Sequence, residues 1–225
     1  MHSKIVTLIL AISLLSGSVT AQQNVHVEPS PWAFSWGAGM GTMIPAGSLG
    51  NNFKTGFAVD TELNIYYNKM FFMINGGFSS NTLLRNIPVE MVNDESTWPK
   101  GSNALHAFIG GNIGINILEA DNISFYPFTG IGYGFIEPNL KTANSDPVLS
   151  ALKINSLVWN AGFGVDYNFP DKDYDPTGIN RILKVGLRYQ FQKPDYEGDV
   201  AGFGGSTHWF TLRFVIGSSM PGRVI

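Results

Sequence analysis

The feature that most constrains this chain is an alternation of large apolar residues with small or polar ones, which recurs between residues 32 and 217. A period of two predicts β-strands with one apolar face, because successive side chains of a strand point to opposite sides. Beyond the first 21 residues, no apolar run approaches the roughly 20 residues that a membrane-spanning helix needs. We expect eight strands, at about 32–42, 56–67, 70–79, 104–118, 123–136, 154–168, 182–192 and 207–217.

The segment 104–118 shows the pattern most clearly. One face carries Leu105, Ala107, Ile109, Ile113, Ile115 and Ile117, and the other carries His106, Gly110, Asn112, Gly114 and Asn116. The segment 70–79 is less regular because both faces begin with apolar residues. There we expect Phe72, Ile74 and Phe78 on the apolar face and Asn75, Gly77 and Ser79 on the other.

The connections between the expected strands alternate in length. Those after strands 1, 3, 5 and 7 are long, at 43–55, 80–103, 137–153 and 193–206, whereas 68–69 and 119–122 are short. Long extracellular loops and short periplasmic turns are typical of bacterial outer-membrane barrels, which have an even number of strands. The connection 169–181 is the exception, because it should be short and has thirteen residues.

Charge placement separates a membrane barrel from a soluble barrel. Only 14% of the residues are charged, against about 25% in average soluble domains. In this register no Asp, Glu, Lys or Arg falls on the large apolar face of any expected strand. A charge on a lipid-facing wall costs roughly 2–4 kcal/mol near the bilayer midplane. The sequence therefore predicts an all-β fold, an eight-stranded antiparallel up-and-down transmembrane β-barrel.

The opposite face carries about six charges that balance in sign, and in a narrow barrel these side chains fill the lumen. We interpret them as an ion-pair network that compensates buried charges; the alternative is an ion path. Lys184 on strand 7 is expected to approach Asp166 near the periplasmic end. The predicted network comprises Asp60, Glu62, Asp166, Lys184, Arg188 and Arg213.

The first 21 residues are typical of a secretory signal peptide, with Lys4 before an apolar run at Ile5 to Leu15 and small residues before Gln22. We therefore expect residues 1–21 to be removed, 22–31 to form a short periplasmic segment, 32–217 the barrel and 218–225 a C-terminal tail. The absence of cysteine excludes disulfides, cysteine nucleophiles and a lipoprotein anchor. Without Lys4 the chain has 13 basic and 17 acidic residues, and no basic patch predicts nucleic-acid binding.

Taken together, residues 32–217 resemble the small outer-membrane β-barrel superfamily that includes the OmpA transmembrane domain and OmpX-type proteins of the porin family. The resemblance rests on the strand count and on Gly-aromatic strands such as Tyr126-Pro-Phe-Thr-Gly-Ile-Gly-Tyr-Gly-Phe135. Such barrels usually end on an aromatic residue, whereas Ser218 to Ile225 follow the last strand here. The resemblance implies an integral protein of the bacterial outer membrane.

Three classes of function remain open. The first is a non-enzymatic structural or interaction barrel, or a subunit of a larger outer-membrane assembly, with outer-membrane lipid and other outer-membrane or surface proteins as partners. The second is a narrow porin, and the third is a lipid-modifying enzyme. For the first class, the longest loop, 80–103, suggests an interaction site or a lid over the barrel mouth. Exposing its many apolar side chains to water would be unfavourable, so they are expected to be covered. The candidate residues are Leu84, Ile87, Val89, Met91 and Trp98.

Catalytic, metal and cofactor sites find little support. His106 lies near Ser102 and Asn103, and His208 near Ser206, but no acidic residue has the local spacing to orient either histidine. The series Asp171, Asp173 and Asp175 lacks the glutamate that would complete a calcium loop. We therefore expect no catalytic residue, no metal and no cofactor.

Overall fold

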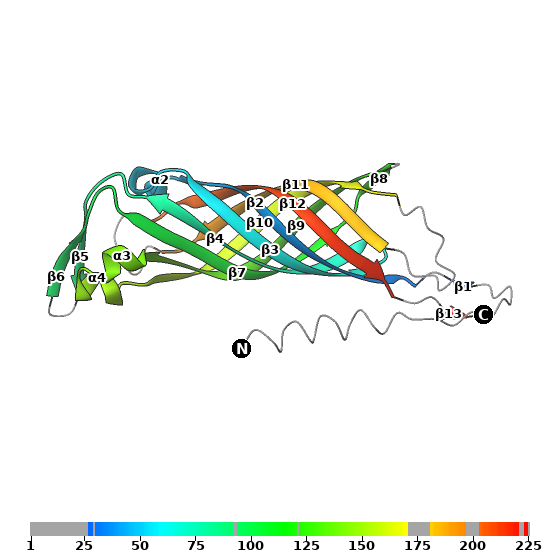
Figure 1. The fold of residues 1–225 in the computed structure, drawn as a ribbon, viewed down its shortest axis with the longest axis horizontal. Coiled ribbons are helices and arrows are strands. Elements are labelled where there is room, and N and C mark those ends of the chain that lie inside the picture. The colour runs from blue at the N-terminus through cyan, green and yellow to red at the C-terminus, as the bar shows by residue number, and fades with distance from the viewer. Residues whose placement is uncertain are drawn as a thin grey trace.

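Eight long strands pair in chain order and close into a ring in the computed structural model of the protein (Figure 1). All neighbours are antiparallel, and the pairing of β9 with β10 completes the barrel. The predicted up-and-down barrel is therefore confirmed. Its strands are β2 (Trp32–Ala46), β3 (Gly56–Tyr67), β4 (Met70–Thr82), β7 (Asn103–Ile115), β9 (Ile123–Pro138), β10 (Ile154–Asn168), β11 (Arg181–Pro194) and β12 (Ser206–Ser219).

Short elements decorate the two ends of the barrel. The structure describes residues 27–28, 30–91, 94–120, 122–170, 181–196, 203–220 and 223–224. No helix within these ranges is long and apolar enough to cross a membrane. The short elements are β1 (Val27–Glu28), α2 (Ser48–Asn52), β5 (Ile87–Met91), β6 (Asp94–Trp98), β8 (Leu118–Ala120), α3 (Leu140–Ala143), α4 (Pro147–Ala151) and β13 (Arg223–Val224).

The two ends of the barrel differ in their connections. Figure 1 shows α2, β5, β6, α3 and α4 gathered at one end, which we call the loop end. The other end, which we call the turn end, carries β8 and the β1–β13 pair. There β3 and β4 are joined by Asn68 and Lys69, and Asn68 takes the left-handed conformation (φ 53°) that a tight turn requires. The predicted signal peptide, residues 1–21, and most of the connection 169–181 lie outside the described residues.

The alternation along each strand separates a lumenal face from an outer face. In β4, the least regular segment of the sequence, Asn75 and Ser79 are buried, whereas Phe72, Ile74 and Phe78 are exposed. This agrees with the predicted faces. Because the period is two, a slip of one residue would have reversed every assignment.

The outer wall is apolar over its whole middle. In the eight barrel strands, outward-facing charged residues occur only at strand ends, at Glu137, Arg181 and Lys193. Outward-facing threonines bond to backbone carbonyls of neighbouring strands: Thr61 donates to Gly37 O at 3.0 Å and Thr129 to Asn160 O at 3.0 Å. A hydroxyl satisfied in this way no longer needs water.

Several strands extend further than expected at the loop end. β2 continues to Ala46, β4 to Thr82 and β11 to Pro194, because antiparallel pairing persists beyond the strictly alternating residues. The strand expected at 104–118 instead ends at Ile115, and Leu118–Ala120 forms the separate β8, which pairs with β9. The longest expected loop, at 80–103, contains the β5–β6 hairpin.

Candidate functional site

The register of the strands arranges the lumenal charges. Along one line across the strands, successive Cα partners on β3, β2, β12, β11 and β10 are Asp60, Gly39, Arg213, Gly186 and Asp166. Charged residues therefore alternate with glycines around this part of the wall. A Cβ on Gly186 would collide with the Asp166 carboxylate. It would also lie 2.6 Å from the backbone oxygen of Val165. In an eight-stranded barrel the interior is only wide enough for side chains, so the glycines give the charged groups room to meet.

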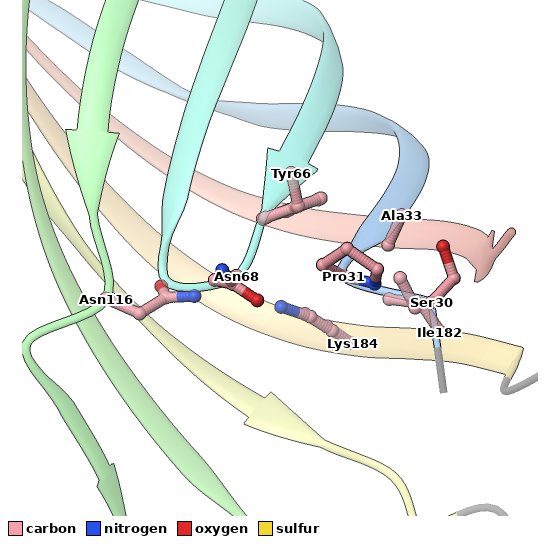
Figure 2. A pocket seen from close by; sticks show the side chains of 8 residues that line it. All are labelled: Ser30, Pro31, Ala33, Tyr66, Asn68, Asn116, Ile182 and Lys184. Atoms are coloured by element: carbon pink, nitrogen blue, oxygen red, sulfur yellow. The ribbon is translucent and has the colours of Figure 1, made fainter. Parts of the chain in front are cut away.

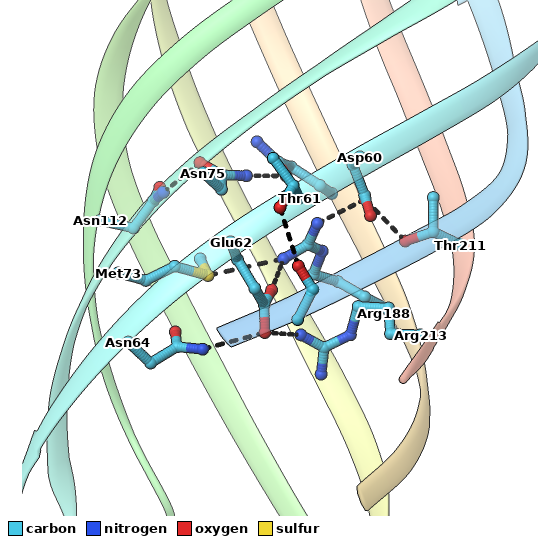
Figure 3. A network of polar contacts seen from close by, with 12 residues as sticks. Asp60, Thr61, Glu62, Asn64, Met73, Asn75, Asn112, Arg188, Thr211 and Arg213 are labelled. Carbon is cyan, nitrogen blue, oxygen red and sulfur yellow. Dashed lines mark hydrogen bonds and ion pairs between the residues drawn. The ribbon is translucent and has the colours of Figure 1, made fainter. Parts of the chain in front are cut away.

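Two arginines hold three carboxylates in the lumen, and Figure 3 shows two of these carboxylates, Asp60 and Glu62. Arg188 forms ion pairs with Asp60 and Glu62, and Arg213 forms ion pairs with Glu62 and, at 2.7 Å, with Asp166. All five side chains are buried. A buried charge that loses its partner is destabilising by several kcal/mol. These groups therefore compensate one another only as a set.

Neutral side chains complete the coordination of the network. Thr211 donates to Asp60 at 2.9 Å, and Asn64 donates to Glu62 at 3.0 Å. Arg213 also donates to the hydroxyl of Tyr126. Carboxylates in a water-poor interior need several hydrogen bonds to replace hydration. These donors supply them and fix the carboxylate orientations.

An amide ladder extends the network across the lumen. Asn112 donates to Asn75 at 2.7 Å, and Asn75 donates to Gln190 at 2.9 Å. The ladder joins β7 and β4 to β11, which is not their neighbour in the ring. Together with the arginines it spans the interior from wall to wall.

The expected approach of Lys184 to Asp166 is replaced by another arrangement. Asp166 pairs with Arg213, and the Cα partner of Lys184 on β10 is Asn168, one inward position nearer the turn end. Lys184 Nζ instead lies 5.3 Å from the centre of the Tyr66 ring. There it lines an open cup of about 270 Å³ (Figure 2). The other lining residues are Ser30, Pro31, Ala33, Tyr66, Asn68, Asn116 and Ile182.

Apolar layers lie on either side of the ion pairs. Towards the turn end, Phe71, Met73, Tyr126 and Phe128 form a buried cluster. Towards the loop end, Met43, Ala58, Phe108 and Trp209 form a second one. The lumen is therefore filled by side chains above and below the charged level.

A larger apolar cluster covers the mouth at the loop end, and we call it the lid cluster. Three of the predicted loop residues, Ile87, Val89 and Trp98, belong to it, and Trp98 is completely buried. Leu84 is half-buried beside the cluster's Leu83, and the side chain of Met91 lies outside the described residues. The cluster comprises Leu49, Phe53, Leu83, Ile87, Val89, Trp98, Ala104, Ile136, Leu149, Leu152, Ile154, Tyr196 and Phe203.

The lid cluster explains why the longest loop is so apolar. Its buried side chains pack against this barrel's own rim, so Ile87, Val89 and Trp98 are not displayed to a partner. Burial also raises the pKa of the Tyr196 phenol well above its usual range. The β5–β6 hairpin is thereby fixed to the mouth by one face.

A polar contact joins the hairpin to the next loop. Ser96 on β6 bonds to Asp146, which also accepts hydrogen bonds from the backbone N–H groups of Val148 (2.8 Å) and Leu149 (3.4 Å). Asp146 is thus the N-cap of α4. The Ser96 hydroxyl and these backbone donors hold the pKa of the Asp146 carboxyl below its usual range.

Neither histidine has a carboxylate partner among the contacts of the described residues. His106 lies in the lumen with its ring edge-on to Phe53 at 4.7 Å, and its Nε2 is buried without a hydrogen bond. His208 faces outward and bonds to Tyr189 and Ser206. Within the described residues no three histidine or acidic side chains could hold a metal ion. The Asp171, Asp173 and Asp175 series lies outside them.

Comparisons with known proteins give similarities of fold. No protein-family model matches the chain, and no curated protein matches it. The chain is similar to the crystal structure of Neisserial surface protein A, with 13% identity and a TM-score of 0.49 over 85% of this chain and 98% of that one. It is also similar to Ail, the attachment invasion locus protein of Yersinia pestis, in complex with the heparin analogue sucrose octasulfate. That match has 13% identity and a TM-score of 0.33 over 84% and 96% of the two chains.

The lid cluster was only partly visible in the sequence. Its members outside the longest loop, such as Leu49, Phe53, Leu149 and Phe203, come from the three other long connections. Each is a single apolar residue or pair without periodicity. The visible signal was that four polar loops each carry a few large apolar residues, which is unusual for free loops.

Proposed function

We propose that the chain is an integral barrel of a bacterial outer membrane, exported by the predicted signal peptide, that acts as a non-enzymatic structural or surface-interaction protein. The observation that carries this proposal is an apolar outer wall around a lumen closed at several heights. Long loops are extracellular and short turns periplasmic in such barrels. The loop end would therefore face the outside of the cell.

The outer wall supports insertion in lipid. Large apolar side chains such as Leu157, Ile131 and Leu187 are more than 60% exposed. A contiguous apolar surface of this extent is unstable in water but suits a bilayer. In the middle of the wall, the outward hydroxyls of Thr61 and Thr129 are bonded to backbone carbonyls. The wall thus meets the requirement that groups in the hydrocarbon be satisfied internally.

The filled lumen favours an interaction or structural role over a porin. A conducting path must pass the lid cluster and the level of Arg188 and Arg213, and both are occupied by buried side chains. If the lid cluster opens, the level of Arg188 and Arg213 still blocks the lumen, and the reverse also holds. We therefore propose that the intact barrel does not conduct.

We assign surface recognition to the exposed face of the β5–β6 hairpin. Pro88 and Thr97 are Cα partners on this face, and Pro88, Glu95 and Thr97 are all exposed. The opposite face is anchored in the lid cluster. Binding groups commonly collect on loops that a rigid scaffold holds in place. The predicted loop residues would then act as anchors, and the polar face would meet the partner.

Single cysteines test the location and the orientation, because the chain contains no other cysteine. With the proposed topology, Thr97→Cys reacts with a membrane-impermeant maleimide on intact cells, whereas Lys69→Cys reacts only after the outer membrane is permeabilised. The protein should require detergent for extraction, and boiling should change its gel mobility. Extraction as a soluble monomer without detergent contradicts the proposal, and the reverse labelling pattern inverts the topology.

Bilayer conductance tests the closed lumen. Wild type, Arg188→Ala and a deletion of residues 85–98 should each remain closed, because each retains at least one of these two barriers. Any conductance should appear first in the combined variant, where only the two apolar layers remain. A steady conductance of the wild-type barrel would move the narrow-porin alternative ahead.

A photoreactive cross-linker tests the recognition face. Attached at Thr97→Cys on intact cells, it should give an adduct that is lost when Glu95→Lys is added. Ser145→Cys, an exposed position on another loop, is the matched control. Equal adducts from Thr97→Cys and Ser145→Cys would contradict the assignment of recognition to the β5–β6 hairpin.

A further inference from the structure

A hydrogen-bonded polar group interrupts the apolar outer wall near the loop end. A hydrogen bond of 2.8 Å joins the Tyr189 hydroxyl to His208 Nδ1, and Ser206 Oγ lies 3.5 Å from His208 Nε2. The nearby Lys193 Nζ donates to Gly205 O at 3.2 Å. We call Tyr189, Lys193, Ser206 and His208 the rim cluster.

The strand register puts these four side chains together on the outer surface. Tyr189 and Lys193 alternate with the buried Gln190 and Gln192 of β11, and Ser206 and His208 alternate with the buried Thr207 of β12. The Cα partner of Thr207 is Gln192, which puts Lys193 opposite Ser206. The cluster therefore faces the surroundings of the barrel and not its lumen.

The rim cluster retains donor capacity that its internal bonds do not use. An ammonium group has three donors, and the contact with Gly205 O uses one of those of Lys193. If Tyr189 donates to Nδ1 of His208, the imidazole proton is on Nε2 and points to the Ser206 oxygen, so the Ser206 hydroxyl keeps its own proton to donate. Outward threonines of the wall such as Thr61 instead bond to backbone carbonyls. The cluster thus presents a cation and a hydroxyl donor outward.

On the outer wall, apolar residues lie next to the rim cluster on the side that faces the middle of the barrel. His208 packs edge-on against Phe191, and Tyr189 lies 5.0 Å from Phe210. The Cα partner of His208 on β2 is Ile44, which is also exposed. His208 is the third residue of β12, about 7 Å along the strand from its start at 3.3 Å per residue. This position near the loop-end rim places the cluster close to the lipid headgroups if the barrel is inserted as proposed above.

We propose that the rim cluster binds the phosphate group of a membrane lipid in the extracellular leaflet, with its acyl chains along Phe191, Phe210 and Ile44. Lys193 supplies the charge, and the Ser206 hydroxyl, which the His208 imidazole orients, donates to a phosphate oxygen. Charge-assisted bonds of this kind are about twice as strong as neutral ones. The inference rests on the proposed insertion in the outer membrane.

Lipid binding to the purified full-length barrel in detergent tests the inference. Mixed micelles contain phosphatidic acid, phosphatidylcholine or diacylglycerol, and native mass spectrometry counts the bound lipids. Wild type should retain phosphatidic acid in preference to the other two. Lys193→Gln should weaken retention about tenfold, the change expected for losing roughly 1.4 kcal/mol of a charge-assisted contact. His208→Phe keeps an aromatic ring on the wall and should also reduce retention.

Lys153→Gln is the matched control for charge. Lys153 is also a cation near the loop end, but its Nζ lies 4.5 Å over the Phe135 ring and outside the rim cluster. It should retain wild-type binding. An equal loss with Lys153→Gln, or displacement of the lipid by millimolar inorganic phosphate, would overturn the inference. Unchanged retention in Lys193→Gln and His208→Phe would do the same while leaving the membrane location, tested by fractionation, untouched.

Discussion

Arg213 reaches Asp166 at 2.7 Å across Gly186, the residue that separates them in the register of the barrel. The pair therefore joins β12 to β10 over the inner face of β11. The contact depends on the absence of a side chain at Gly186 as much as on the charges of Arg213 and Asp166. Gly39 likewise lies between Asp60 and Arg213 in the register, but there Asp60 pairs with Arg188 instead.

Gly186→Ala should destabilise the barrel. The new Cβ would lie 2.6 Å from the backbone oxygen of Val165 and collide with the Asp166 carboxylate, so the ion pair with Arg213 has to shift. Overpacking of this kind typically costs about 1–3 kcal/mol. Urea unfolding in detergent micelles, followed by tryptophan fluorescence, measures the difference.

Gly111→Ala provides the control for this substitution. Gly111 faces outward, and a Cβ there would meet only the Phe72 ring at 3.6 Å, an ordinary contact. Its stability should equal or slightly exceed that of the wild type, because alanine reduces the entropy of the unfolded chain. If both glycine variants unfold at the same urea concentration, the account of Gly186 as a spacer is wrong.

Arg188→Ala should be the most damaging single change in the lumen. It leaves Asp60 without its arginine and Glu62 with only Arg213, and loss of one partner of a buried pair costs on the order of 3–5 kcal/mol. Lys184→Ala removes a cation–aromatic contact at the open cup and should cost less than about 1 kcal/mol. Thermal unfolding measures both.

Neutralising a stranded carboxylate should rescue part of the loss. Adding Asp60→Asn to Arg188→Ala removes one uncompensated charge, so the double variant should be more stable than Arg188→Ala alone. Additive losses in the double variant would show that the arginine acts through packing and not through charge.

The sequence was sufficient for the strands and their faces, because both follow from local alternation. Residues such as Asn75 and Phe72 could be assigned to opposite faces from neighbours within a few positions. The pairing inside the lumen could not be predicted in the same way. Asp166 pairs with Arg213 and not with Lys184 because of the height of each residue in the register and the gap at Gly186. These are relations between strands that the pattern within one strand does not contain.

The lid cluster shows a second limit of sequence reasoning. The apolar residues of the longest loop predicted either a partner site or a lid, and both outcomes bury the same side chains. Only the position of Trp98 against Phe53, with ring centres 5.9 Å apart, distinguishes them, since Phe53 belongs to another loop. Contacts between loops without periodicity depend on the completed barrel that brings the loop ends together.

Trp98→Ala should loosen the lid while the barrel stays intact. Removing a completely buried tryptophan costs about 3–5 kcal/mol where the site cannot collapse. The cost should appear as local opening, because the cluster lies beyond the charged network and contributes little to strand pairing. Hydrogen exchange should accelerate at Leu149 and Leu152 and remain slow in β11 and β12.

Trp98→Phe tests whether the loss depends on the size of the cavity that the substitution leaves. The indole Nε1 of Trp98 is buried without a partner, so phenylalanine removes no hydrogen bond and leaves a smaller cavity. This variant should exchange nearly as slowly as the wild type at Leu149. Acceleration of β11 and β12 in Trp98→Ala would instead make the lid part of one cooperative unit with the barrel.

The cap of α4 should give the lid a dependence on pH. The folded pKa of Asp146 is lowered by the Ser96 hydroxyl and by the backbone N–H groups of Val148 and Leu149. A lowered folded pKa means that the carboxylate's contribution to stability is complete above the unfolded value, about 3.9. It is lost as the pH falls through the lower folded pKa. Hydrogen exchange of the Val148 and Leu149 amides, corrected for intrinsic rates, should therefore lose protection below about pH 4.

Two substitutions at Asp146 separate its charge from its hydrogen bonds. Asp146→Ala should remove the protection of Val148 and Leu149 at every pH, because alanine cannot accept their hydrogen bonds. Asp146→Asn keeps an acceptor without a titratable charge, so it should retain partial protection that no longer changes around pH 4. A pH dependence that persists in Asp146→Asn would assign the effect to another carboxylate.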